Sequence, residues 1–171
     1  MKGFGDQHKS KNKRQKKSAP SKEQIINQAF QFHSEGNISE AAKYYQNLIT
    51  QGCNDHRVFS NYGIILKDLS KLKEAELSFC KATEIKPDYA EGHSNLGNIL
   101  KDLGKFEDAE MSYRKAIEIK PDYAEAYFNL GILLRIIGKF EDAKLCSEKI
   151  MSLRSWSILG SYSFNAEMKL D

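Results

Sequence analysis

Cysteine, proline and long apolar runs are scarce in this sequence of 171 residues, and each scarcity excludes a class of protein. The cysteines are odd in number, far apart and without a CxxC pair, which argues against a disulfide framework and favours a reducing compartment. They are Cys53, Cys80 and Cys146. The longest apolar stretch, 132–137, is interrupted by Arg135 and is far too short to span a bilayer. Because no apolar segment follows Lys2, no signal peptide is predicted, and we expect a cytoplasmic protein without a membrane span.

Signatures of catalysis are missing as well. The sequence contains no HExxH, GxSxG or GxGxxG segment, and its four histidines have no metal-ligand spacing. The Gly-Lys pairs at 104–105 and 138–139 lack the earlier glycine of a phosphate-binding loop, because Ile99 and Leu133 stand at that place. We therefore expect no enzymatic activity, no metal and no cofactor.

Charge is unevenly distributed along the chain. Residues 1–22 hold eight lysines and arginines against Asp6 alone, which leaves 18 basic and 22 acidic residues in the rest of the chain. Segment 1–21 is low in apolar residues and is predicted to be a disordered basic tail. No aromatic residue interrupts its basic run, as stacking on single-stranded nucleic acid would require. We expect nucleic acid to bind there weakly at most.

An internal repeat of 34 residues accounts for most of the sequence. Glycine recurs at this interval, as do alanine, proline and the hexapeptide KPDYAE. The glycines are Gly63, Gly97 and Gly131; the alanines are Ala41, Ala75, Ala109 and Ala143; the prolines are Pro87 and Pro121. The register defines four units at 22–55, 56–89, 90–123 and 124–157, followed by 158–171.

Each unit contains two amphipathic helical patterns. In the third unit the first pattern runs through His93, Leu96, Gly97, Leu100 and Leu103, and the second through Phe106, Ala109, Tyr113, Ala116 and Ile117. Glycine inside a helix costs about 1 kcal/mol relative to alanine. Its recurrence in three units indicates that neighbouring helices cross closely there. Asp122 and Glu125 stand at capping-box spacing and predict a helix that starts at this point.

These residues resemble the tetratricopeptide repeat consensus over about residues 22–157. The resemblance is carried by Leu96, Gly97, Gly104, Phe106, Ala109, Tyr113, Ala116 and Pro121 in the third unit. It implies an all-α fold, a right-handed superhelical solenoid of four helix-turn-helix repeats. The end units depart from the consensus, with Ala29 in place of glycine and Ser147 in place of the aromatic residue. Atypical end repeats are common, and 158–171 is predicted to be a capping helix or a tail.

Polar residues recur on the face of the first helices that the core does not use. One set, the asparagine column, comprises Asn27, Asn61, Asn95 and Asn129, and Asn98 lies on the same side. A second set, the basic column, comprises His33, Lys67, Lys101 and Arg135. The asparagines either hold neighbouring helices together or offer a donor and an acceptor to the backbone of a peptide. We favour peptide binding.

The asparagine column also resembles the asparagine ladder of the repeat domain in O-linked N-acetylglucosamine transferases, where such residues hold extended peptide. The resemblance implies a scaffold that binds an extended segment of a partner protein, and we expect a monomer. An alternative is a truncated or paralogous repeat module of a longer glycosyltransferase or other transferase. An RNA-associated adaptor that binds through the basic tail is a third and weaker hypothesis.

Overall fold

A computed structural model describes the backbone of residues 20–167 and the side chains of residues 20–153. Over this range all regular elements are α-helices, and no strand is present. The basic tail predicted at 1–21 therefore lies outside the described residues, except for its last two positions.

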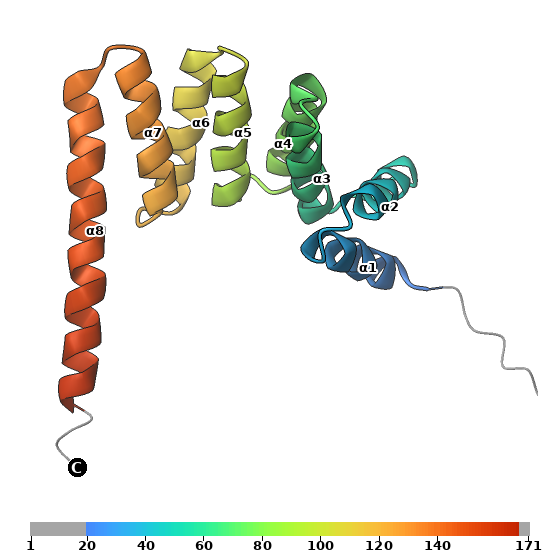
Figure 1. Ribbon diagram of the computed structural model, residues 1–171, viewed down its shortest axis with the longest axis horizontal. Helices are drawn as coiled ribbons and strands as arrows, with labels where there is room; N and C mark the ends of the chain where they lie inside the picture. Colours follow the sequence, from blue (N-terminus) through green and yellow to red (C-terminus); the bar gives the residue numbers. More distant parts are fainter. Residues whose placement is uncertain (1–19, 168–171) are drawn as a thin grey trace, which may run out of the picture.

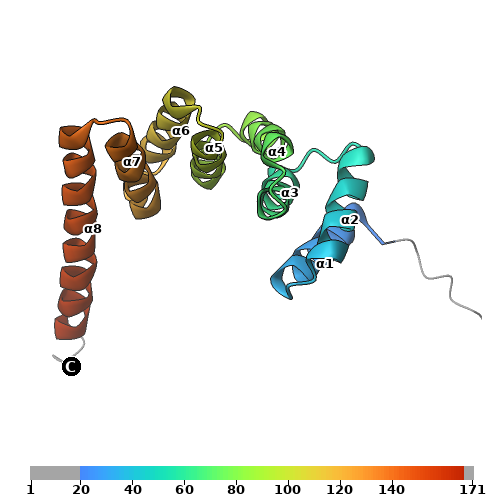
Figure 2. The same ribbon diagram turned by 45° about the horizontal axis from the view of Figure 1, so that its top comes forward.

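The described helices follow one another in antiparallel pairs, one pair in each unit. Figure 1 and Figure 2 show them side by side in one curved row, from α1 at one end to α8 at the other. The pairs are α1 (Lys22–Ser34) with α2 (Ile38–Thr50), α3 (His56–Asp68) with α4 (Leu72–Ile85), α5 (Ala90–Asp102) with α6 (Phe106–Ile119), and α7 (Ala124–Ile136) with α8 (Phe140–Glu167). The predicted all-helical solenoid with two helices in each unit is confirmed.

The last helix differs from the expectation. Helix α8 has 28 residues, whereas α6, the second helix of the preceding unit, has 14. Segment 158–167 continues α8 without a break, so it forms no separate capping helix; residues 168–171 lie outside the described part of the chain. In both views α8 extends well beyond the end of its partner α7.

Helix starts use fewer side-chain caps than the sequence suggests. At α1, Ser21 and Gln24 form a capping box, and at α3 the Asp55 carboxylate accepts a hydrogen bond from the Arg57 backbone N–H at 2.9 Å. The cap predicted at Asp122 is wrong. Helix α7 begins at Ala124, so its N-cap residue is Tyr123, which makes no side-chain cap bond. Asp122 stands one position too early to cap the helix.

The turns inside the units require a left-handed backbone. Gly36, Gly104 and Gly138 have φ angles of 76°, 75° and 80° in the first, third and fourth units. In the second unit Ser70 adopts φ 59°, and it is the single non-glycine residue with positive φ among the described residues. A side chain in this conformation costs roughly 1–2 kcal/mol, which the surrounding helix pair must offset.

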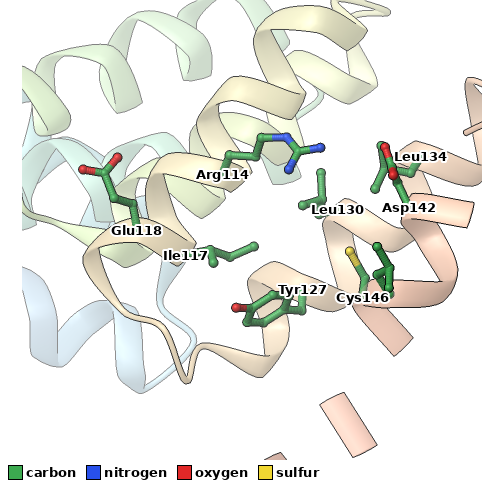
Figure 3. Close-up of a pocket in the computed structure, with 9 residues that line it drawn as sticks. Arg114, Ile117, Glu118, Tyr127, Leu130, Leu134, Asp142 and Cys146 are labelled. Atoms are coloured by element: carbon green, nitrogen blue, oxygen red, sulfur yellow. The ribbon is translucent and has the colours of Figure 1, made fainter. Parts of the chain in front are cut away.

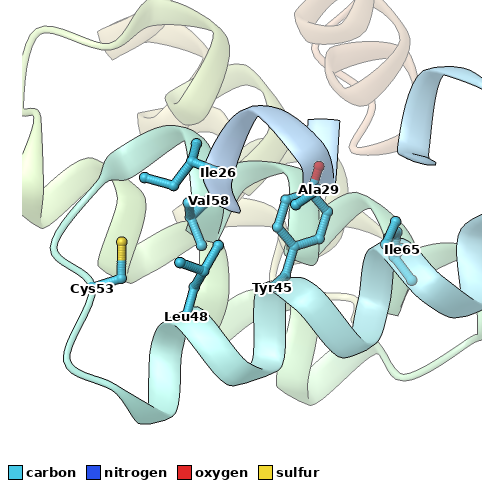
Figure 4. Packing of buried hydrophobic residues seen from close by; sticks show 8 residues of the cluster. Ile26, Ala29, Tyr45, Leu48, Cys53, Val58 and Ile65 are labelled. Atoms are coloured by element: carbon cyan, nitrogen blue, oxygen red, sulfur yellow. The ribbon is translucent and has the colours of Figure 1, made fainter. Parts of the chain in front are cut away.

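The core consists of small clusters between neighbouring helices, such as the one at the N-terminal end in Figure 4, where Tyr45 and Leu48 of α2 meet α1 and α3. The predicted close helix crossing is confirmed at two of the three glycines. A Cβ atom on Gly97 would lie 2.7 Å from Cε1 of Tyr113, and one on Gly63 would lie 2.9 Å from Cζ of Phe79. The aromatic ring of the second helix therefore occupies the space that glycine leaves open.

Ion pairs connect neighbouring units at equivalent places. Lys105, at the α5–α6 turn, donates to Glu76 on α4 at 2.7 Å. One repeat later, Lys139 at the α7–α8 turn donates to Glu110 on α6 at 2.8 Å. Each pair links the second helix of one unit to the turn of the next, and thereby supports the register of the stack.

Candidate peptide-binding groove

The first helices α1, α3, α5 and α7 each present one member of the asparagine column and one member of the basic column. Asn27 is exposed, and the other three asparagines are partly exposed. In the basic column Lys67 and Arg135 are exposed, and His33 and Lys101 are partly exposed. The 34-residue spacing and the regular stacking thus place both columns on the same series of helices.

The amide groups of the asparagine column are not used to join helices. The Asn61 side chain donates to the backbone oxygen of Arg57 at 3.0 Å, a bond within α3 itself. Within residues 20–153, the amides of Asn27, Asn95 and Asn129 make no hydrogen bond. A role in holding the superhelix together would require bonds from these amides to a neighbouring helix.

Asn98 behaves differently from the asparagine column. Its side-chain oxygen accepts a hydrogen bond of 2.7 Å from the hydroxyl of Tyr113, which is buried between α5 and α6. Burial raises the pKa of Tyr113, so the hydroxyl keeps its proton and acts as the donor. Asn98 thus has an architectural contact, and its amide NH2 is the part that faces no such demand.

One member of each column meets in a depression between α1 and α3. Phe30, His33, Ser34, Tyr45 and Asn61 line a space of about 350 Å³. The Tyr45 hydroxyl lies 3.4 Å from Nδ1 of His33. Burial lowers the pKa of His33, and the nearby Asp68 carboxylate partly opposes that shift. The imidazole is therefore mainly neutral at pH 7 and offers hydrogen bonding in place of a fixed charge.

The basic column is unpaired but not isolated from acidic groups. Among the described residues Lys67, Lys101 and Arg135 make no ion pair, unlike Lys105 and Lys139 at the junctions between units. The exposed carboxylates Asp68 and Asp102 directly follow the two lysines in sequence. The fourth unit has Ile136 at this place. Positive charge is thus least compensated at Arg135.

An apolar patch lies beside Arg135 on α7. Phe128 and Ile136 are 59% and 56% exposed, and Ile132 between them is partly exposed. In the second and third units the place of Phe128 is taken by a buried serine, Ser60 or Ser94. The patch is therefore specific to the C-terminal end of the first-helix surface.

A second hollow lies among the last three helices and was not predicted from the sequence. Its volume is about 440 Å³, and Figure 3 shows its lining. The residues are Arg114, Ile117 and Glu118 of α6, Tyr127, Leu130 and Leu134 of α7, and Asp142, Leu145 and Cys146 of α8. A smaller hollow one unit earlier contains His93, Leu96, Leu100 and Asp108 at positions 34 residues before Tyr127, Leu130, Leu134 and Asp142. This periodicity was the signal available in the sequence.

The chemistry of this second hollow is unreactive. Burial raises the pKa of the Cys146 thiol, so the thiol stays protonated at neutral pH, when it is a poor nucleophile. Within the described part of the chain, no group of three or more His, Cys, Asp or Glu side chains is arranged to hold a metal ion. Nor does any described helix have both the length and the apolar character of a membrane span.

Known proteins confirm the repeat class. A family profile described as tetratricopeptide repeat matches residues 56–89 and 124–155, and one described as TPR repeat matches residues 97–135. The chain contains tetratricopeptide repeats. The first unit lies outside these matches, in keeping with its departures from the tetratricopeptide consensus.

Solved tetratricopeptide structures share the fold at low sequence identity. A crystal structure of MamA superposes with a TM-score of 0.76 at 17% identity and covers 81% of each chain. YrrB, described as a TPR protein with an unusual peptide-binding site, superposes with a TM-score of 0.71 at 18% identity, covering 85% of this chain and 75% of YrrB. No curated protein matches the sequence. At these identities the likeness shows the fold alone.

Proposed function

We propose that the surface formed by α1, α3, α5 and α7 binds an extended segment of a partner protein. The proposal makes the chain an interaction scaffold and assigns it no catalytic step. Tetratricopeptide repeats and the likeness to YrrB, a peptide-binding repeat protein by its own description, support this class of function.

The observation that carries the proposal is the unused hydrogen-bonding capacity of the asparagine column. Asn95 and Asn129 make no hydrogen bond within the described chain, and Asn61 bonds only within its own helix. An extended peptide presents alternating N–H and C=O groups, which an amide side chain can satisfy independently of the peptide sequence. Asparagine is a mediocre helix former, so helix stability does not explain its recurrence.

Side chains near α7 give the partner a direction. Phe128, Ile132 and Ile136 form an exposed apolar surface beside the unpaired Arg135. In the middle of the groove, Asp68 and Asp102 offset the neighbouring lysines. We expect a segment with an apolar side chain and a carboxylate at the end that reaches α7, and a weaker charge preference elsewhere.

Selection of ligands from a displayed library of random peptides tests the proposal, with the full chain as bait. A selected peptide is then titrated by calorimetry against wild type and a variant with Asn61, Asn95 and Asn129 all replaced by alanine. Because a net hydrogen bond contributes about 0.5–1.5 kcal/mol, the triple variant should lose about 2–4 kcal/mol of binding free energy.

Asn47→Ala on α2 is the matched control, because Asn47 is an exposed asparagine on a second helix. It should leave affinity within about 0.5 kcal/mol of wild type. Circular dichroism checks that each variant keeps its helical content. Equal affinities of wild type and a folded triple variant for every selected peptide would reject the proposal.

A further inference from the structure

The C-terminal end of the repeat stack has the surface of an interface between units, but no described element covers it. Figure 1 and Figure 2 show α8 as the last helix of the row, with α7 on one side. Four α8 residues that share one stripe of the helix define what we call the end surface. They are Phe140, Lys144, Ser147 and Met151.

Comparison with the preceding unit identifies this surface. Phe106 and Ile117, which lie 34 residues before Phe140 and Met151, are partly buried because they pack against the hydrophobic cluster shared with α7 and α8. Phe140 and Met151 themselves are 67% and 71% exposed. The same apolar positions that join the third unit to the fourth are therefore open at the end of the fourth.

A further unit of the same kind does not fit this surface. At the two preceding junctions the acidic residues Glu76 and Glu110 accept a lysine from the next unit. The corresponding residue in the fourth unit is Lys144. A lysine arriving from another such unit would meet a like charge, which is unfavourable at this distance. The occupant should instead bring a carboxylate to Lys144.

The end surface is complementary to itself when two copies of α8 run antiparallel. The stripe has spacings of four, three and four residues, so antiparallel pairing about its centre sets Phe140 opposite Met151 of the second copy. Lys144 then lies beside Ser147 and Glu148 of the second copy. Lys144 and Glu148 are exposed, and neither makes an ion pair among the described residues. The small Ser147 side chain at the centre lets two helices approach closely.

We propose that the protein forms a two-fold dimer through antiparallel pairing of α8, in which Phe140 packs on Met151 and Lys144 pairs with Glu148 across the axis. Contact between an aromatic ring and a thioether is favourable, and a closed two-fold interface repeats each contact twice. This dimer departs from the monomer expected from the sequence. It uses none of the groove residues, so it stands independently of peptide binding.

Sedimentation velocity of the full chain over a wide range of concentrations tests the dimer. Wild type should show a reversible monomer–dimer equilibrium. Met151→Glu should raise the dimer dissociation constant by about 30-fold or more, as loss of a central apolar contact does. Leu77→Glu on α4 is the control, because Leu77 is also 71% exposed but lies away from α8. Its dissociation constant should stay within about twofold of wild type.

Charge reversal supplies a second and sharper test. Lys144→Glu and Glu148→Lys should each raise the dimer dissociation constant by about tenfold, because two symmetry-related pairs become like-charge contacts. The double variant restores opposite charges across the axis and should recover most of the wild-type affinity. Circular dichroism verifies that helical content is unchanged.

Three results would overturn the proposal. The first is a wild type that stays monomeric at every concentration, which would leave the end surface to a helix of another protein. The second is a dimer that Leu77→Glu dissociates and Met151→Glu does not. The third is a double charge variant that dimerises more weakly than either single variant, because that result excludes pairing between the two positions.

Discussion

The third and fourth repeats follow the same sequence plan but are packed differently. In the third, the Tyr113 ring is buried against Gly97 and its hydroxyl bonds to Asn98. In the fourth, Ser147 takes the place of the aromatic residue and is exposed. A Cβ atom on Gly131 would meet only Cβ of Cys146 at 3.4 Å, an ordinary contact.

This difference shows that the glycine has structural meaning only together with its partner. Gly131 preserves the sequence pattern although the ring that requires glycine is absent from its unit. The first unit shows the converse case, with a buried Ala29 at this place and a buried Tyr45 in the second helix. The glycine column therefore marks the repeat, whereas the aromatic column decides how closely each helix pair packs.

Removing the aromatic residue should have the largest effect on this comparison. Tyr113→Ala should destabilise the array by about 3–5 kcal/mol, because a large buried side chain leaves a cavity. Ser147→Ala should cost less than about 0.5 kcal/mol, since its side chain is exposed. Urea unfolding followed by circular dichroism measures both, and Tyr113→Phe, expected to cost about 1 kcal/mol, isolates the hydrogen bond to Asn98. Similar losses for Tyr113→Ala and Ser147→Ala would contradict the assigned packing.

Substitution of the two glycines should give effects of opposite sign. Gly97→Ala places a methyl group 2.7 Å from the Tyr113 ring, and overpacking of this kind costs about 1–3 kcal/mol. A gain of about 1 kcal/mol in helix propensity offsets part of that cost. Gly131→Ala has the same gain without the clash, so it should be neutral or should stabilise by up to about 1 kcal/mol. Thermal and urea unfolding of the pair decide the point; equal destabilisation by both would contradict it.

The smallest expected effect concerns the ion pair that joins the third and fourth units. Hydrogen bonds from Lys139 and then Arg114 hold the pKa of Glu110 below its usual range. Glu110→Gln should cost about 0.2–1 kcal/mol at neutral pH, because the cations are half exposed. Lys144→Ala on the end surface, which breaks no ion pair among the described residues, should cost less.

The pH dependence of the Glu110→Gln effect has a definite sign. A carboxyl group with a lowered folded-state pKa contributes its full stability above its unfolded pKa and loses it as pH falls through the folded value. The difference in unfolding free energy between wild type and Glu110→Gln should therefore shrink as pH is lowered into and below the carboxyl range. A difference that stays constant with pH would mean that the charge of Glu110 does not stabilise the junction.

Periodicity carried most of the fold. The 34-residue interval and the two apolar patterns in each unit were enough to predict the helix pairs, and the recurring glycines predicted the close crossing later found between Gly97 and Tyr113. The prediction was wrong at Asp122, because spacing alone does not say at which residue the turn ends and the helix begins. The length of α8 was also missed, since no glycine or proline marks a stop in its first two turns beyond the unit.

The candidate groove shows the same division. Helical geometry placed the asparagine and basic columns on the first helices, and their use by a partner remains a prediction. Spacing could not show that Asn98 bonds to Tyr113 while Asn95 makes no described hydrogen bond, because that depends on the path of α6. It also could not show the exposure of Phe128 and Ile136, which depends on what α8 leaves uncovered.

The sequence by itself determined the elements and their repetition, because helix periodicity, turn glycines and prolines act over a few residues. Tertiary structure alone decided which repeated positions are buried, which amides are satisfied and which face of α8 remains open. The physical reason is that each of these properties depends on atoms from a neighbouring unit. Phe106 and Phe140 occupy the same place in the repeat, yet one is covered by the next unit and the other is exposed.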